Sequence, residues 1–209
     1  MAPTTWSDVT RALGLRPPAQ VAEPVSSHAA VSLVLRQAEP GLELLFIHRA
    51  EHPDDRWSGQ MAFPGGRAEP GEDDLAVTAV RETAEETGVD LRESGELLGA
   101  LDEMQAMARG RHLDLAIRPF VFRLAGGPVL RFNHEVRAAY WIPLDGLMGR
   151  DWRSTMEYVH DGSTFQLPCI RWGGPVIWGL TFRMLQNLET LLGEARQADR
   201  RGETVAVPG

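Results

Sequence analysis

The sequence predicts a mixed α/β fold, in which helices pack on a sheet. Three observations support this prediction: several apolar segments of strand length, one acidic helix directly after a glycine-rich loop, and one long amphipathic helix near the C-terminus. The 209 residues suit one domain with small additions and are enough to bury a core. With 43% hydrophobic and 24% charged residues, the composition is that of an ordinary soluble globular protein.

The elements follow from the order of apolar residues and turn formers. A short helix is expected within residues 1–15, and the prolines of RPPAQVAEP predict a linker after it. Five segments are expected to be strands: HAAVSLVLRQ, GLELLFIHRA, ELLGALDEM, LDLAIRPFVFRL and EVRAAYWIPL. TMEYVHD and STFQLPCIRW predict a hairpin. The chain thus divides into a helix and linker at 1–27, a main domain at 28–195 and a flexible tail at 196–209.

The last long element is expected to be a helix that spans PVIWGLTFRMLQNLETLLGEA. Its apolar residues recur at helical spacing and predict one buried stripe, formed by Ile177, Leu180, Met184, Leu185, Leu188 and Leu191. The N-terminal segment and the hairpin offer a surface on which a homodimer can form.

Composition excludes several classes of function. The net charge of −8 argues against a nucleic-acid-binding protein, and no apolar run is long enough to cross a membrane. The N-terminus has no pattern of a secretory signal, and the single cysteine, Cys169, cannot form an internal disulfide, so we expect a cytoplasmic protein. Cys169 is interpreted as a small buried hydrophobe. The chain has no lysine, which excludes P-loop and Schiff-base lysine chemistry.

The segment RETAEETGV, residues 81–89, places three glutamates within five positions: Glu82, Glu85 and Glu86. The pattern predicts a helix over residues 74–87, with Asp73 or Asp74 as N-cap and Gly88 as the C-terminal stop. At about 100° per residue, the three carboxylates lie within about 100° of one face. The opposite face is expected to enter the core through Val77, Val80 and Ala84. The cluster is either a solvated acidic patch or a cation site.

The loop FPGG, residues 63–66, stands directly before this helix and favours the cation site. Paired glycines allow the backbone to approach a ligand closely, and a glycine carbonyl can serve as an oxygen ligand. A hard cation such as Mg²⁺ prefers carboxylate, carbonyl, water and phosphate oxygens. Such an ion would offset the repulsion between the glutamates.

These residues resemble the Nudix box, whose usual form is Gly-x5-Glu-x7-Arg-Glu-U-x-Glu-Glu-x-Gly-U with U apolar. The chain reads Gly66-x5-Glu72-x8-Arg81-Glu82-Thr83-Ala84-Glu85-Glu86-Thr87-Gly88-Val89. The second spacer is one residue longer than usual, and Thr83 stands where an aliphatic residue is commoner. The longer spacer and the stretch TAVRE at 78–82 resemble the coenzyme A pyrophosphatase branch of that family.

The resemblance implies an α/β/α sandwich with a mixed central sheet, in which the box forms a loop-helix-loop motif. It also implies a hydrolase of nucleoside diphosphate derivatives that requires Mg²⁺ or Mn²⁺. The implied catalytic residues are Glu82, Arg81 and Glu86, with Glu82 as a metal ligand or the general base and Arg81 orienting the carboxylates. The implied metal ligands are Gly66 through its carbonyl, Glu82, Glu85, Glu86 and, from outside the box, Glu135. Glu103 is the second choice for that outside acid, and Glu72 is a supporting acid or a charge at the start of the helix.

The segment upstream of the box resembles the same branch at Arg49, Gly59, Gln60, Phe63 and Pro64. The implied substrate-binding residues are Arg49, Arg56, Gln60 and Phe63. The guanidinium groups of Arg49 and Arg56 can bind phosphates in pairs of hydrogen bonds, and the alternative for both is surface pairing with nearby acids. Arg56 is displaced from the branch's position, and Trp57 is either a base-stacking residue or a loop anchor. The implied substrate is coenzyme A or an acyl-CoA. ADP-ribose, nucleotide sugars, noncanonical nucleoside triphosphates and a non-catalytic sensor role remain alternatives.

Overall fold

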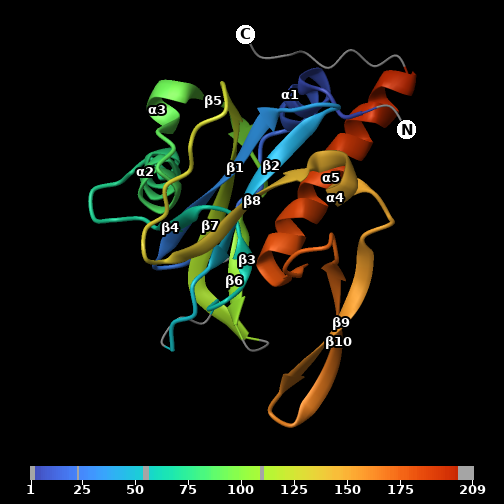
Figure 1. Ribbon diagram of the computed structural model, residues 1–209. Coiled ribbons are helices and arrows are strands. Elements are labelled where there is room, and N and C mark those ends of the chain that lie inside the picture. Colours follow the sequence, from blue (N-terminus) through green and yellow to red (C-terminus); the bar gives the residue numbers. More distant parts are fainter. Residues whose placement is uncertain (1–2, 23, 54–56, 109–110, 202–209) are drawn as a thin grey trace.

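The computed structural model describes residues 3–22, 24–53, 57–108 and 111–201. These residues form a mixed central sheet with helices on both faces, which confirms the predicted mixed α/β fold (Figure 1). No helix in the described part of the chain is both long and apolar enough to cross a membrane.

The sheet is organised around β1 (His28–Gln37), which pairs in parallel with β7 (Arg111–Leu124) and antiparallel with its other neighbours. Along the main path the strand order is β3-β2-β1-β7-β5, while β4, β6 and β8 pair with β1, β7 and β2. The bounds of these strands are β2 (Leu42–Arg49), β3 (Met61–Ala62), β4 (Gly65–Arg67), β5 (Gly95–Ala100), β6 (Met104–Ala108) and β8 (Val136–Pro143). The segment predicted as one strand at 96–104 is instead β5 and the start of β6.

Side chains of β1 alternate between the two faces of the sheet, as the two-residue period of a strand requires. Leu33 and Leu35 enter the larger apolar cluster, whereas Ala30 and Val34 enter the smaller one. In Figure 1, α2 (Leu75–Thr87) and α3 (Leu91–Ser94) lie on one side of the sheet. On the other side lie α1 (Trp6–Gly14) and α5 (Gly179–Arg201), and the short α4 (Leu144–Met148) follows β8.

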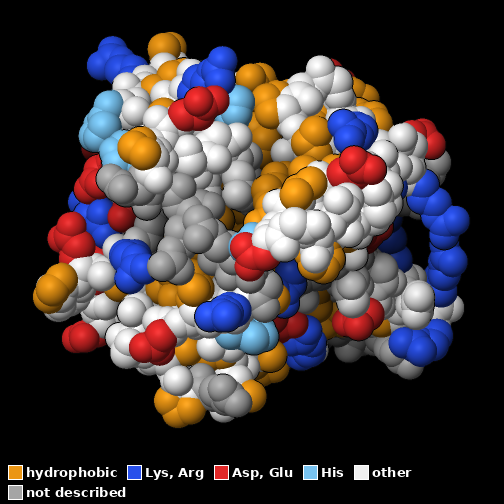
Figure 2. All heavy atoms as spheres, turned by 90° about the horizontal axis from the view of Figure 1, so that it is seen from below, with side chains coloured by type: hydrophobic (Ala, Val, Ile, Leu, Met, Phe, Trp, Pro, Cys, Tyr) orange, Lys and Arg blue, Asp and Glu red, His pale blue; other side chains and the backbone are white. Residues whose placement is uncertain are grey.

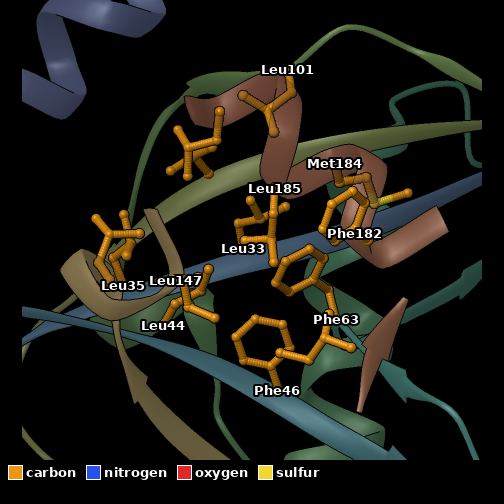
Figure 3. Packing of buried hydrophobic residues seen from close by; sticks show 14 of the residues in the cluster. Leu33, Leu35, Leu44, Phe46, Phe63, Leu101, Leu147, Phe182, Met184 and Leu185 are labelled. Atoms are coloured by element: carbon orange, nitrogen blue, oxygen red, sulfur yellow. The ribbon is translucent and has the colours of Figure 1, made fainter. Parts of the chain in front are cut away.

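The larger cluster fills the space between the sheet and α5. Figure 3 shows Leu33 of β1, Phe63 and Leu185 pointing toward one another there, with Phe182 beside them. The rings of Phe46 and Phe63 lie 4.8 Å apart, centroid to centroid. This cluster fixes the loop that contains Phe63, and that loop leads directly into Gly65 and Gly66.

Local sequence sets both ends of α2. The Asp74 carboxylate accepts a hydrogen bond from the Ala76 N–H at 2.9 Å, so Asp74, of the two predicted candidates, is the N-cap. Gly88 ends the helix with a φ of 72°, a left-handed conformation that glycine adopts without steric cost. Its N–H donates to the Ala84 carbonyl at 2.9 Å.

The buried face of α2 differs from the prediction. Its buried residues are Thr78, Ala79, Thr83, Glu86 and Thr87. Val77, predicted to enter the core, is 44% exposed, while Val80 packs against the edge of the smaller cluster. The helix is therefore turned so that small and hydroxyl side chains meet the sheet, where β1 presents Ala30 and Ser32. Close approach of helix and strand has outweighed the hydrophobicity of Val77.

The predicted hairpin is confirmed as β9 (Arg153–His160) and β10 (Ser163–Ile170), which extends away from the body of the molecule (Figure 1). The predicted start of the last helix at Pro175 is wrong. Ile177 and Trp178 instead form β11, which pairs with β10. Gly179, the first residue of α5, has a φ of 64°, so the chain leaves right-handed helical geometry between the strand and the helix. The helix continues through Arg201, beyond the predicted boundary at residue 195.

The N-terminal helix is part of the main core. A capping box starts it, in which the Thr5 hydroxyl accepts from the Asp8 N–H and the Asp8 carboxylate accepts from the Thr5 N–H. Val9 and Ala12 are fully buried in the larger cluster. Cys169 is also fully buried, which confirms its interpretation as a core residue.

Candidate functional site

A cleft of about 500 Å³ opens beside β4 and the start of α5. Its polar lining includes Arg49, Gln60, Gly66, Arg67, Arg81, Glu82, Glu85 and Glu135. Its apolar lining includes Trp57, Met61, Phe63, Leu115, Ile117, Leu180 and Met184. Figure 2 views the molecule from below the orientation of Figure 1; basic and acidic side chains are interspersed on this face, with hydrophobic side chains gathered between them. Charged residues from distant parts of the chain thus meet at one cleft with an apolar wall.

Glu82 lies against the backbone of Gly66. A Cβ atom added at Gly66 would overlap the Glu82 carboxylate, so only glycine allows this approach. The Arg81 Nη1 donates to Glu82 Oε1 at 2.9 Å. Burial raises the pKa of Glu82, and the charges of Glu85 and Glu135 add to the rise, while Arg81 opposes it.

Glu86 lies deeper than the other glutamates, at 2% exposure, and is not among the residues that line the cleft. Its Oε2 accepts a hydrogen bond from the Gly65 N–H at 2.8 Å, and its Oε1 lies 3.6 Å from Arg49 Nη1. Burial raises the pKa of Glu86 to about 8, although the Gly65 N–H and Arg49 both favour the charged form. The start of β4 and the end of β2 therefore both contact the same carboxylate.

Arg81 connects the carboxylates on this side of the helix. Its Nε donates to Glu72 Oε1 at 2.9 Å, its Nη2 donates to the Arg67 carbonyl at 3.0 Å, and its Nη1 lies 3.4 Å from Glu85. The bond from Arg81, with those from the Glu69 N–H and the Thr78 hydroxyl, lowers the pKa of Glu72 to about 2. Glu72 thus stays ionised and anchors Arg81.

Glu135 and Glu103, the two candidates for a metal-binding acid outside the box, lie in different places. Glu135 lines the cleft, its backbone carbonyl accepts from the Ala50 N–H at 2.8 Å, and its charge contributes to the raised pKa values of Glu82 and Glu86. Glu103 is not among the cleft-lining residues. Its carboxylate accepts from the Val21 N–H at 3.1 Å and from Arg118 at 3.3 Å, so it fastens the N-terminal linker.

The donor set suits a hard divalent cation, because it consists of carboxylates and backbone carbonyls. Gly66, with no Cβ, leaves room for an oxygen ligand and Glu82 on the same side. As the side chains lie, however, no three acidic, histidine or cysteine side chains among the described residues are close enough together to hold a metal ion. Like charges repel, and the guanidinium of Arg81 draws Glu82 and Glu85 toward itself.

The predicted substrate-binding residues are only partly brought together. Arg49, Gln60 and Phe63 line the cleft, whereas Arg56 lies outside the described residues. Phe63 is only 3% exposed, so it reaches the cleft from within the core.

Sequence reasoning did not single out the apolar wall formed by Leu115, Ile117, Leu180 and Met184. Leu180 and Met184 were predicted to belong to the buried stripe of the last helix, and Leu115 and Ile117 lie within a predicted strand. Periodicity alone could not show that this face borders a cleft.

Comparison with known proteins identifies the architecture. The family model of the NUDIX domain matches residues 26–161 of the chain. An uncharacterised protein of Schizosaccharomyces pombe is 43% identical over 108 residues, which are 50% of this chain and 33% of that protein. The chain thus spans about a third of that relative's length. A protein of Yersinia pestis described as "Uncharacterized Nudix hydrolase NudL" is 29% identical over 150 residues, covering 71% of this chain and 72% of that one.

Solved structures agree in fold. A MutT/nudix family protein from Enterococcus faecalis has a TM-score of 0.52 at 18% identity and covers 94% of this chain and 70% of its own. An Ap4A hydrolase from Caenorhabditis elegans has a TM-score of 0.51 at 17% identity and covers 84% of this chain and 98% of its own. At these identities the similarity concerns the fold alone.

Proposed function

The chain belongs to the Nudix family, and from this premise we propose that it hydrolyses the pyrophosphate bond of coenzyme A or an acyl-CoA. The observation that carries the proposal is the cleft where Gly66, Glu82, Glu85 and Glu135 meet a wall of apolar side chains. Relatives described as Nudix hydrolases support a hydrolase that acts on pyrophosphate bonds.

The proposed metal ligands are the carbonyl of Gly66 and the carboxylates of Glu82, Glu85, Glu86 and Glu135. When bound, Mg²⁺ or Mn²⁺ supplies positive charge to the diphosphate and acidifies a water molecule. Glu82 lines the cleft, whereas Glu86 is buried behind Gly65, so we assign the proton of the attacking water to Glu82. Arg81 keeps Glu82 in place through its own anchor, Glu72.

The cleft suits a substrate with one charged and one largely apolar part. Arg49, 3.6 Å from Glu86, lies where it can contact a phosphate oxygen beside the carboxylates. Leu115, Ile117, Leu180 and Met184 offer an apolar wall to the pantetheine arm or an acyl chain. Addition of water across the P–O–P linkage then yields adenosine 3′,5′-bisphosphate and 4′-phosphopantetheine or its acyl derivative.

Other substrates of the same chemical class, namely ADP-ribose, nucleotide sugars and noncanonical nucleoside triphosphates, have no apolar arm of this length. The alternative of a non-catalytic sensor predicts that glutamates of the box have been lost. Glu82, Glu85 and Glu86 are all present. These observations favour the enzyme and the coenzyme A class.

The test compares coenzyme A, an acyl-CoA, ADP-ribose, nucleotide sugars and triphosphates as substrates, with Mg²⁺ and with Mn²⁺. We expect coenzyme A or the acyl-CoA to have the highest kcat/KM. Faster hydrolysis of another compound would refute the coenzyme A assignment but not the hydrolase. Absence of product from every compound would refute the proposal that the protein is an enzyme.

The metal assignment is tested with Glu82→Gln and Glu86→Gln. Each keeps the side-chain shape but removes a charge, so we expect kcat/KM to fall by at least about a hundredfold. Glu93→Gln, on the exposed face of α3, is the matched control and should retain full activity. Full activity of Glu86→Gln would show that this carboxylate does not hold the metal.

A further inference from the structure

Ser32 contacts both the segment that leads into Gly65 and the acidic helix α2. It lies in the middle of β1 and is fully buried. Its N–H donates to the Pro64 carbonyl at 2.8 Å, which holds the loop before Gly65. Its hydroxyl lies 3.0 Å from the Ala79 carbonyl and 2.8 Å from the Thr83 hydroxyl, both on α2. One residue thus contacts the glycine loop through its backbone and the acidic helix through its side chain.

Thr83 shares the Ala79 carbonyl with Ser32. It is fully buried, and its hydroxyl oxygen also lies 2.7 Å from the Ala79 carbonyl. Each hydroxyl has one hydrogen to donate and can also accept, so Thr83 and Ser32 satisfy each other and Ala79 in a small closed network. A buried hydroxyl without a partner is costly, whereas an aliphatic side chain at either position would have no directional preference. The pair therefore allows few relative positions of helix and strand.

The network lies beside the carboxylates. Thr83 directly follows Glu82 and precedes Glu86 by three positions, just under one helical turn. The loop on the other side of Ser32 presents Gly65, whose N–H donates to Glu86, and Gly66, against which the Glu82 carboxylate lies. A rotation or slide of α2 on β1 would move both carboxylates away from these glycines.

We propose that Ser32 and Thr83 are positioning residues, which hold α2 in register with Pro64 and with Gly65 and Gly66 at the start of β4. Because of this register, Glu86 faces the Gly65 N–H and Glu82 faces Gly66. The consequence for metal binding rests on the proposed function, whereas the register itself involves only contacts within the chain.

The test uses Ser32→Ala, Thr83→Val and the double variant. Both substitutions nearly preserve side-chain volume, and Ser32→Ala retains the backbone bond to Pro64. Thr87→Val is the matched control, because Thr87 is a fully buried threonine of the same helix. Its hydroxyl donates to the Thr83 carbonyl and accepts from the Val89 N–H, and neither of these partners is on β1. This variant should lower stability without altering the contact between α2 and β1.

Two measurements on the full chain report the register. Hydrogen exchange of the Gly65 amide, followed by NMR without metal, should be about fivefold faster in Ser32→Ala and in Thr83→Val, the factor that corresponds to one net hydrogen bond. The dissociation constant for Mn²⁺, measured by calorimetry, should rise by a similar factor. The double variant should show less than the product of the two effects, because both belong to one network. Thr87→Val should change neither quantity more than about twofold.

Unchanged Gly65 exchange in both Ser32→Ala and Thr83→Val would overturn the proposal, even if both variants unfold at lower temperature. An effect of Thr87→Val as large as theirs would also overturn it, since general loosening would then explain the result. If the wild-type protein binds no Mn²⁺, the metal part of the proposed function fails, and the Gly65 exchange still decides whether Ser32 and Thr83 position the helix.

Discussion

At the scale of single residues, the site depends on how closely carboxylates approach backbone atoms. Glu86 accepts the Gly65 N–H at 2.8 Å, and Glu82 occupies the space that a side chain at Gly66 would fill. Arg81 offsets part of the repulsion, since it contacts Glu82 and is itself anchored by Glu72. A methyl group added at Gly66 is therefore expected to lower activity more than one added elsewhere on the surface.

The first prediction concerns Gly66→Ala. The new methyl group would collide with the Glu82 carboxylate and displace it, and a displacement of about 1 Å can cost about a hundredfold in rate. We expect kcat/KM to fall by about that factor while the far-ultraviolet circular dichroism spectrum is unchanged. In Gly127→Ala, the control, the added Cβ atom meets nothing within 4 Å, and activity should be preserved. Equal activity of Gly66→Ala and wild type would show that Glu82 need not approach Gly66.

At the scale of elements, Asp102 joins three parts of the chain. Its carboxylate accepts both Nη atoms of Arg16 at 2.6 Å, the Ala19 N–H at 2.8 Å and the Asn187 side-chain amide at 3.0 Å. The linker after α1, the segment after β5 and α5 are thereby held together. The bonds from Arg16, followed by those from Ala19 and Asn187, lower the pKa of Asp102 to about 2.

The second prediction follows from the sign of this shift. A carboxyl group whose pKa is lower in the folded state stabilises the fold above its ordinary pKa of 3.8, and this contribution disappears as the pH falls toward about 2. Asp102→Asn should therefore lower the free energy of unfolding by about 1 kcal/mol at pH 7, with the difference from wild type vanishing near pH 2. Urea unfolding between pH 2 and pH 7 measures it. Asp151→Asn, at an exposed side chain, should match wild type throughout. A pH-independent difference for Asp102→Asn would contradict the prediction.

At the scale of the whole molecule, the N-terminal helix completes the core beneath α5. Val9 and Ala12 are fully buried in the larger cluster, and α1 packs along α5. Before the helix, the Thr4 N–H donates to Asp145 at 3.0 Å, and the Thr4 hydroxyl accepts from Arg196 at 2.9 Å. The division of the chain at residue 27 therefore does not separate two independent cores, and we expect one cooperative unit.

The third prediction is that Val9→Ala lowers the free energy of unfolding by about 2 kcal/mol, through lost burial and the cavity left behind. Chemical unfolding should remain a single transition that is the same by fluorescence and by circular dichroism. The control is Val129→Ala, because Val129 is 80% exposed and its truncation should change stability by less than about 0.5 kcal/mol. A separate early transition in the wild-type protein would show that α1 unfolds independently.

Much of the fold could be predicted from local pattern. The strand at 28–37 and the helix that ends at Gly88 follow from side-chain period and from turn and cap residues, which act over a few neighbouring positions. The short strands β3, β4 and β11 could not be predicted, because two or three residues have no period and are strands only through their partners. The start of α5 was misplaced because a positive φ at Gly179 is invisible in a pattern of apolar residues.

The order of residues alone was enough to predict that Gly66, Glu82, Glu85 and Glu86 lie close together. The spacing of Gly66, Glu82, Glu85 and Glu86 on a loop and one helix suffices to predict an oxygen-rich site, since helix geometry fixes their angular relation. The burial of Glu86 and the contact between Thr83 and Ser32 could not be read from residue order, because the rotation of a helix on a sheet depends on the close fit of both surfaces. The apolar wall from β7 and α5 became part of the same cleft for the same reason: it requires contacts between segments far apart in the chain.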